Sequence, residues 1–233
     1  MTETLTTRTL GELVAEAPAR ARVLDQLGLD YCCHGDRSLA EASRAAGVDP
    51  ATVVAALSAA IPQAPVSTGA GTDPQALIDE IVAGHHRYLW EELPALVALS
   101  AKVAEVHGSR HPELPAVHDL VVALRADLEP HMTKEERILF PAVRLLVDGP
   151  RQFGFGTIGN PIGMMRLEHE QAGELLAELR RVTGDYAVPD DGCASYESLY
   201  RRLEHLEEDT HLHIHKENNV LFPMALALDA AGS

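Results

Sequence analysis

An eleven-residue pattern that occurs twice constrains this chain more than any other feature of its sequence. Residues 131–141 read HMTKEERILFP, residues 213–223 read HIHKENNVLFP, and both match H-x-x-K-E-x-x-x-L-F-P. Each copy places a histidine four residues before a glutamate, as His131/Glu135 and as His213/Glu217. On an α-helix such residues share one face, with Cβ atoms about 5–6 Å apart. Both copies therefore predict a helix that presents an imidazole and a carboxylate side by side.

The face that carries each pair continues into apolar residues. These are Ile138 in the first copy and Val220 and Met224 in the second. We therefore expect both pairs to point into a core, where an unpartnered carboxylate would be costly. A single His–Glu pair is more often solvated, but two copies in matched sequence frames favour metal ligation.

The repeat also separates the candidate ligands from their neighbours. Among the closely spaced His211, His213 and His215, only His213 matches the histidine of the first copy. We expect His211 and His215 to be exposed or to support the ligands from behind. Glu136 follows Glu135 but points about 100° away on a helix, so we expect it to be solvated.

Composition and the position of a segment rich in helix-breaking residues predict an all-α protein with two domains. Aromatic residues are only 4% of the 233 residues, while Ala, Leu, Glu and Val abound, which favours helices over sheets. Residues 61–74 are rich in Pro, Ser, Gly and Thr and are typical of a linker. We expect a small helical domain over residues 1–60. For residues 75–233 we expect an antiparallel four-helix bundle, a plan that four amphipathic helices with modest loops favour.

Helix signals give approximate boundaries. The bundle helices are expected to begin at residues 73–74 and then to cover about 113–146, 161–182 and 195–226. Four prolines inside or near the ends of these helices predict kinks, namely Pro94, Pro130, Pro141 and Pro223. Capping signals give about three short helices in the small domain, from Thr9 with Glu12, Ser38 with Glu41, and Asp49 before Pro50.

So small an N-terminal unit has a thin core, and we expect it to pack against another surface. A homodimer would help to cover it.

Charge and cysteine content exclude several classes of partner and site. The net charge of −16 argues against nucleic acid and against anionic membrane surfaces, because phosphates would be repelled. No apolar run is long enough to span a bilayer, and the first residues lack the pattern of a signal peptide. Three cysteines, two of them adjacent, do not make a disulfide framework. We therefore expect a reducing cytoplasm.

The first and third bundle helices offer further histidines. The segment GHHRYLW contains His85 and His86, and the apolar pattern around them does not choose between the two. His169 lies on an apolar face, where Gly173 one turn later would leave space beside a metal. Glu168 lies off that face and is either solvated or part of a path for iron or protons.

The donor set indicates a pair of metal ions. Four imidazoles and two carboxylates are too rich in nitrogen for calcium or magnesium, and a structural zinc needs only four ligands. Two bridging glutamates and an oxo or hydroxo bridge would leave one open position on each of two six-coordinate ions. This is the coordination of a non-haem di-iron centre, although manganese and zinc also suit these residue types. The ferritin-like plan is excluded, because Glu-x-x-His occurs only once, at Glu208–His211.

At this point the sequence resembles a known family. HHRYLWEELP, HMTKEERILFP, PIGMMRLEHEQAG and HIHKENNVLFP are similar to the iron–sulfur cluster repair di-iron proteins, whose larger domain is hemerythrin-like. LDYCCHGDRSLAEA resembles the small cysteine-bearing domain of that family, so the resemblance covers nearly the whole chain. It implies that two iron ions are bound by one histidine of the first pair, His86, together with His131, Glu135, His169, His213 and Glu217, the two glutamates being the bridges.

The resemblance also implies a function. Such proteins restore iron–sulfur clusters damaged by nitric oxide or peroxide, supply iron, and bind or reduce nitric oxide. Cys32 and Cys33 could form only a strained, readily reduced disulfide, and in this family they would accept iron or supply electrons. Otherwise they are two small residues buried in a turn. The alternative function is a hemerythrin-like oxygen or iron sensor or store without repair activity, which would have no use for a cysteine-bearing domain.

Overall fold

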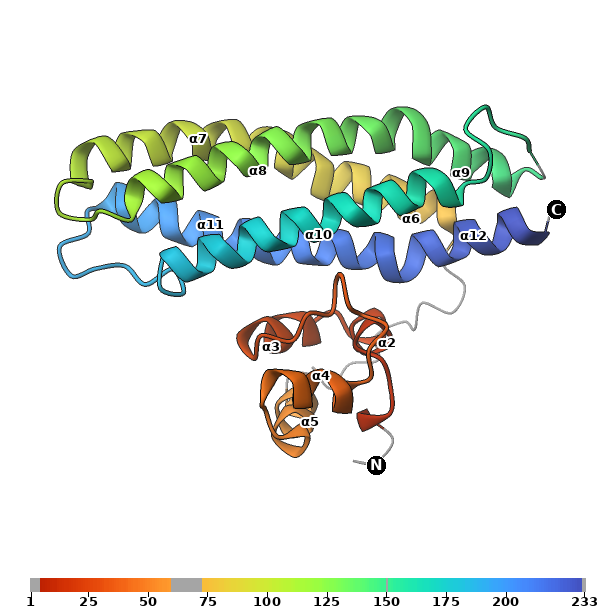
Figure 1. Ribbon diagram of the computed structural model, residues 1–233, viewed down its shortest axis with the longest axis horizontal. Helices are drawn as coiled ribbons and strands as arrows, with labels where there is room; N and C mark the ends of the chain where they lie inside the picture. The colour runs from red at the N-terminus through yellow and green to blue at the C-terminus, as the bar shows by residue number, and fades with distance from the viewer. Residues whose placement is uncertain (1–4, 60–72, 150, 232–233) are drawn as a thin grey trace.

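The computed structural model describes residues 5–59, 73–149 and 151–231. Within these ranges every named element is a helix, and the helices form a long bundle with a smaller unit beside one of its faces (Figure 1). The predicted all-α class and the helical bundle are thereby confirmed. None of the described helices is both long and apolar enough to cross a membrane.

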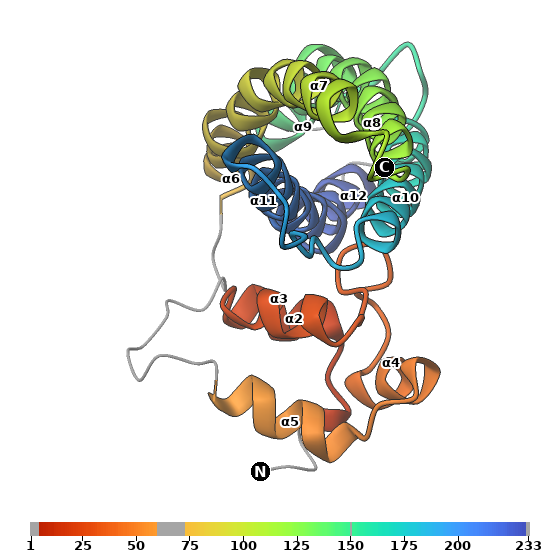
Figure 2. The ribbon, with the colours of Figure 1, turned by 90° about the vertical axis from the view of Figure 1, so that its left-hand side faces the viewer.

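Four helical rods make up the described part of the bundle, and three of them contain a short π-helical segment. In chain order, rod 1 is α6 (Pro74–Ile81), η1 (Val82–His86) and α7 (Arg87–His107), rod 2 is α8 (Leu114–Lys134), η2 (Glu135–Leu139) and α9 (Phe140–Val147), rod 3 is α10 (Gly159–Val182), and rod 4 is α11 (Ala194–Lys216), η3 (Glu217–Leu221) and α12 (Phe222–Ala231). Rods that follow one another in sequence pack side by side, and rod 4 closes the ring against rod 1 (Figure 2).

Local sequence sets the start of the bundle. The side chain of Asp73 accepts a hydrogen bond from the backbone N–H of Gln75, and Pro74 occupies the first turn of α6. This is an N-cap followed by a proline whose missing N–H costs nothing there. Apart from Asp73 and Pro74, the predicted linker over residues 61–74 lies outside the described residues. The division at this linker into domains 1–60 and 75–233 stays a prediction.

Two apolar clusters fill the bundle and leave a polar layer between them. One contains Leu89, Leu124 and Leu203, and the other contains Phe140 and Phe222, all of them buried. The predicted metal ligands fall between the two clusters along each rod. The core therefore encloses the ligands from both ends of the bundle.

The π-helical segments change which residues face the core. Ile138 lies in η2 with 49% of its surface exposed, whereas Leu139 and Phe140 are buried. The prediction that Ile138 continues the buried face is therefore wrong. A π-helix closes its hydrogen bonds at i→i+5 and so adds one residue to the turn, which moves the apolar positions one residue later.

Pro141 and Pro223 explain where two of these segments lie. Each is the second residue of the helix that follows a π segment, α9 or α12. Proline has no N–H for the carbonyl four residues earlier, and an i→i+5 pattern passes over it. By contrast, α7 and α8 continue as α-helix through Pro94 and Pro130.

Residues 10–59 of the small domain contain four helices, not the three that were expected. They are α2 (Leu10–Glu16), α3 (Arg20–Gln26), α4 (Leu39–Ala46) and α5 (Pro50–Ala59). The expectation was wrong because it missed the break at Ala17 and Pro18, where the residue before proline avoids the helical conformation. Both predicted capping boxes, at Thr9 and at Ser38, are confirmed.

The small domain rests on rod 4 of the bundle. Its apolar cluster contains Leu10, Leu24 and Tyr31, and Ile214 of α11 belongs to the same cluster. The turn between α3 and α4 carries the cysteine pair and points at the bundle (Figure 2). As expected, so small a unit completes its core on another surface, and that surface is the bundle of the same chain.

Candidate metal centre

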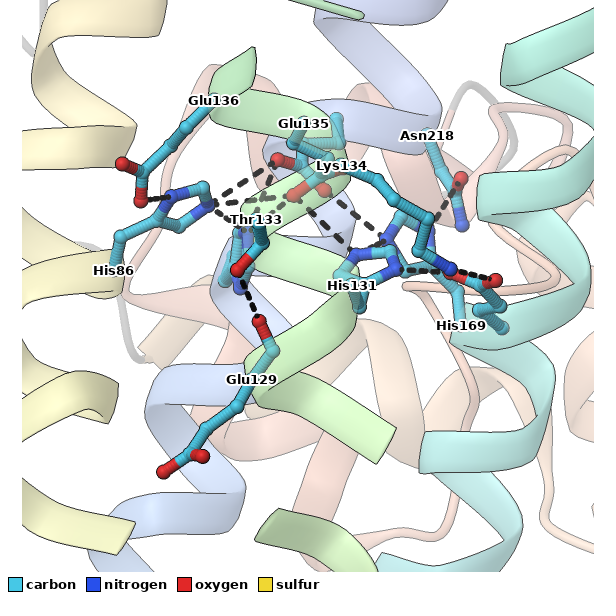
Figure 3. Close-up of polar contacts among 12 residues, drawn as sticks. His86, Glu129, His131, Thr133, Lys134, Glu135, Glu136, His169 and Asn218 are labelled. Atoms are coloured by element: carbon cyan, nitrogen blue, oxygen red, sulfur yellow. Dashed lines mark hydrogen bonds and ion pairs between the residues drawn. The ribbon is translucent and has the colours of Figure 1, made fainter. Parts of the chain in front are cut away.

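All six side chains predicted to bind metal meet in the middle of the bundle. Figure 3 labels four of them, His86, His131, Glu135 and His169. Each of the six has at most 2% of its surface exposed. They come from all four rods: His86 from η1, His131 and Glu135 from α8 and η2, His169 from α10, and His213 and Glu217 from α11 and η3.

The six residues form two groups that share both glutamates. His86 and His213 with the glutamates make the first group, and His131 and His169 with the same glutamates make the second. The Nε2 atoms of the two histidines lie 3.2 Å apart in the first group. They lie 3.0 Å apart in the second. Each group offers two imidazole nitrogens and two carboxylates to one ion.

The glutamates lie between the groups. Glu217 places Oε1 3.0 Å from Nε2 of His213 and Oε2 3.1 Å from Nε2 of His169. Oε2 of Glu135 lies 3.4 Å from Nε2 of His86 and 3.3 Å from Nε2 of His131. Each carboxylate can therefore contact an ion in either group, as a bridging ligand must.

The chemistry of this layer fits metal ions better than a set of protein contacts. Among the described residues, neither oxygen of Glu135 has a hydrogen-bond donor, and Oε2 of Glu217 has none. Buried carboxylates without donors are costly unless a cation satisfies them. Imidazole and carboxylate together suit first-row transition metals. The residues fit two ions, each held by two histidines and a share of both glutamates.

Three of the four histidines are oriented by an acceptor on their outer nitrogen. Because carboxylate and amide oxygens accept, each ring in its neutral form carries its proton on Nδ1 and directs the lone pair of Nε2 inward, the tautomer that a metal requires. Nδ1 of His86 donates to Glu136 over 3.0 Å. Nδ1 of His131 donates to Glu168 over 2.8 Å, and Nδ1 of His169 donates to Oδ1 of Asn218 over 3.0 Å.

His213 is held differently. Its Nδ1 is buried and has no partner among the described residues. Its ring lies parallel to that of His85, with ring centroids 5.6 Å apart. On this outer side, packing against His85 takes the place of the hydrogen bond that orients the other three rings.

Sequence reasoning missed this outer layer. Glu136 is exposed, as expected, but it is not merely solvated, because it accepts from His86 and from Nε1 of Trp90. Glu168 is half-buried between His131 and Lys134. Asn218 drew no prediction at all. The available signal was position, since Glu136 and Asn218 each follow the glutamate of one copy of the motif.

The structure separates His86 from His85, which the apolar pattern could not. His86 points into the cluster, whereas Nδ1 of His85 lies 2.9 Å from Asp209 and its Nε2 accepts from Lys216 at 2.9 Å. The π segment η1 ends at His86 and sets this orientation.

His211 and His215 do not behave as expected. Neither is exposed and neither supports a ligand. His211 bonds Asp25 of the small domain at 2.9 Å, and the buried ring of His215 packs edge-on against Tyr31. Both hold the small domain on rod 4, a contact that the sequence repeat cannot reveal.

Electrostatics keeps the central carboxylates ionised. Burial lowers the pKa of His131, but the negative charge of Glu135 and the bond to Glu168 outweigh it and raise the value to about 10. Burial and Glu217 raise the pKa of Glu135, yet His131 and His86 hold it below its ordinary value. The hydrogen bonds from His131 and Lys134 lower the pKa of Glu168 to about 2. Carboxylates are therefore charged where a metal needs them.

The cysteine pair lies next to this layer. Cys32 is buried and Cys33 is half-buried. Their backbone N–H groups donate to Oδ1 of Asp30, over 3.1 Å from Cys32 and over 2.9 Å from Cys33. The Cys33 thiol donates to the backbone carbonyl of His169 over 3.6 Å. The hydrogen bond with Cys33, together with burial, raises the pKa of the Cys32 thiol. Asp30, Cys32 and Cys33 offer a third set of metal-binding atoms.

Gly173 lies beside the cysteine turn. A Cβ atom at Gly173 would lie 3.7 Å from Sγ of Cys33. This is an ordinary van der Waals distance, so this side of α10 faces the cysteine turn, and the space beside a metal at Gly173 stays a prediction.

Comparisons with known proteins agree with both halves of this architecture. Residues 77–225 match the family model "Hemerythrin HHE cation binding domain", and residues 6–61 match "Domain of Unknown function (DUF542)". The chain is 36% identical over 220 residues to proteins named "Iron-sulfur cluster repair protein YtfE" from Salmonella schwarzengrund, Salmonella paratyphi B and Salmonella newport. These alignments cover 94% of this chain and 96% of each relative.

Proposed function

The chain belongs to the family of iron–sulfur cluster repair proteins with a hemerythrin domain, and from that premise we propose that it repairs damaged clusters by donating iron from a di-iron centre. The observation that carries the proposal is the pair of ligand groups that share Glu135 and Glu217. Such sharing suits two adjacent ions and has no purpose at a single-metal site. The clients would be iron–sulfur proteins damaged by nitrosative or oxidative stress.

We assign iron to the two positions, with an oxo or hydroxo bridge between them. Two imidazoles per ion are too many for magnesium or calcium, and structural zinc sites do not share carboxylates in this way. When bound, the irons would supply electrons and one open position each for nitric oxide or another small diatomic ligand. Reduction of nitric oxide at those positions is the enzymatic side of the proposal.

The side chains of this centre suit a donor. Its ligands are imidazoles and carboxylates, without a thiolate, so iron is held less tightly than in a closed thiolate cage. The outer acceptors Glu136, Glu168 and Asn218 keep each Nε2 lone pair directed inward, and the apolar clusters exclude water from both ends. The protein thus retains iron until a stronger acceptor takes it.

The cysteine turn supplies that acceptor. Cys33 touches the backbone of His169, and Cys32 and Asp30 complete a set of soft and hard donors on the outer side of rod 3. We propose that iron leaves through these thiols to the client protein. The thiols must be reduced to bind iron, which agrees with a cytoplasmic location.

The function is tested by adding iron-loaded protein to a dehydratase whose cluster has been damaged with nitric oxide, and following the return of its activity. Recovery with the wild-type chain and loss of recovery with a Cys32→Ala/Cys33→Ala double variant is the expected result. Reversible oxygen binding without any recovery would instead identify the oxygen or iron store of the alternative hypothesis.

A further inference from the structure

The two copies of the repeated motif perform the same task at one position. The residue after each central glutamate accepts a hydrogen bond from a metal-facing histidine on the neighbouring rod. Glu136, after Glu135, accepts from Nδ1 of His86 at 3.0 Å. Asn218, after Glu217, accepts from Nδ1 of His169 at 3.0 Å.

The chemistry at this position differs between the copies. A carboxylate can only accept, whereas an amide accepts through its oxygen and donates through its nitrogen. Nδ2 of Asn218 donates to the backbone carbonyl of Cys32 over 3.2 Å, and Oδ1 faces His169, as Figure 3 shows for that pair. The carbonyl of Cys32 cannot donate, so the amide has only this orientation. Asn218 therefore links a predicted metal ligand directly to the cysteine turn.

Asn219, the next residue in the second copy, binds the same turn. Nδ2 of Asn219 donates to the carbonyls of Tyr31 at 3.2 Å and of Cys32 at 3.1 Å. Its side chain lies against Gly11 and Gly35, where a Cβ atom on Gly11 would approach Oδ1 of Asn219 to 2.8 Å. The first copy has Arg137 at this position, and Arg137 is exposed. Only the second copy is thus built to receive the small domain.

From this arrangement we propose that Asn218 is a positioning residue that couples docking of the cysteine turn to retention of the iron bound by His131 and His169. The inference rests on the proposed di-iron centre. While the turn is docked, the Cys32 carbonyl fixes the amide, and the amide fixes the imidazole of His169. When the turn moves away, the amide loses its second anchor and the imidazole loses its fixed orientation. The iron nearer the thiols is then released first.

The expected size follows from the behaviour of similar contacts. Removing the hydrogen-bond partner of a metal-binding histidine weakens metal affinity by about 10–100-fold. The coupling must also be reciprocal, so iron binding should strengthen docking of the turn.

A double-mutant cycle tests the coupling. The iron-loaded full-length chain is mixed with a ferrous chelator, and the release of each iron is timed for wild type, Asn218→Ala, Asn219→Ala and the double variant. Asn219→Ala loosens the turn without touching His169, and it should speed the release of one iron about fivefold. Asn218→Ala should speed the same iron about tenfold or more. In the double variant Asn219→Ala should add nothing, because the link is already cut. Additive effects, or no effect of Asn219→Ala, would overturn the proposal.

If Asn218→Ala does not retain iron, Asn218→Asp provides the same test. Asn218→Asp keeps the acceptor for His169 and removes the donor to Cys32. In that background Asn219→Ala must again leave the release rate unchanged, and an increase in rate would refute the coupling.

The reciprocal measurement does not depend on activity. Alkylation of the buried Cys32 should be slower in iron-loaded than in metal-free wild type, and this difference should vanish in Asn218→Ala. An equal difference in both proteins counts against the proposal. Failure of the proposed function looks different: the wild type would load no iron, or would load it and couple normally without restoring a damaged cluster.

Discussion

Oε2 of Glu217 lies 3.1 Å from Nε2 of His169, across the interface between rods 4 and 3, while Oε1 of the same carboxylate lies 3.0 Å from His213 on its own rod. One side chain thus reaches both ligand groups. Glu135 does the same between His86 and His131. The site is a single unit spread over four helices, and its predicted properties follow from that.

Loss of either proposed bridging carboxylate should remove most of the metal. Wild type should contain about two irons per chain, and Glu135→Leu or Glu217→Leu should each reduce this to well below one, because both ions lose a ligand at once. Elemental analysis of purified protein measures the content. Glu91→Leu, at an exposed position of α7, is the matched control and should retain full loading. Full loading of both bridge variants would show that these glutamates are not ligands.

The outer acceptor of His86 should matter through its geometry more than its charge. Glu136→Leu removes the partner of Nδ1 and should weaken iron binding about 10–100-fold, whereas Glu136→Gln keeps an acceptor and should recover most of the affinity. Competition with a chelator of known affinity measures both. Equal affinities for wild type and Glu136→Leu would remove Glu136 from the site.

Iron affinity should rise steeply with pH. Without a metal the pKa of His131 is about 10, so near neutral pH this imidazole must release a proton before it can bind iron. At least one proton is displaced, which makes affinity increase about tenfold or more for each pH unit between 6 and 8. Titration of metal-free protein at pH 6, 7 and 8 is the measurement. An affinity that stays constant over this range is incompatible with a protonated His131.

His215 should make the metal-free fold sensitive to acid. Burial lowers its pKa from 6.5 to about 4, so between these values the unfolded chain binds a proton that the folded chain does not. This contribution to stability is therefore complete above pH 6.5 and is lost as pH falls toward 4. By pH 4.5 the loss is about 2–3 kcal/mol.

His215→Gln cannot titrate and provides the comparison. Urea denaturation of both metal-free proteins at pH 7 and pH 4.5 should show a smaller fall in the free energy of unfolding for the variant. The same fall in both proteins would mean that His215 does not titrate in this range.

Much of the site could be predicted because it depends on local spacing. A histidine and a glutamate four residues apart share a face on any helix, so the duplicated motif alone identified His131, Glu135, His213 and Glu217 as one set. Helix caps were similarly readable at Thr9, Ser38 and Asp73, since each depends on two or three neighbouring residues.

What failed depended on helix type and on neighbours from distant sequence. Uniform α-helical spacing puts Ile138 inside, but η2 adds a residue to the turn and buries Leu139 instead. The roles of Glu168 and Asn218 require knowing which rod packs beside which, and the burial of His215 requires knowing that the small domain covers it. Residue spacing within one helix contains none of this information.

The most direct test of the central claim is a crystal structure of the iron-loaded protein, with anomalous data collected on both sides of the iron absorption edge. Two iron peaks about 3.5–4 Å apart are expected, one between His86 and His213 and the other between His131 and His169, with Glu135 and Glu217 contacting both. A single peak, or iron bound away from these six side chains in fully loaded protein, would contradict the di-iron centre and the donor function built on it.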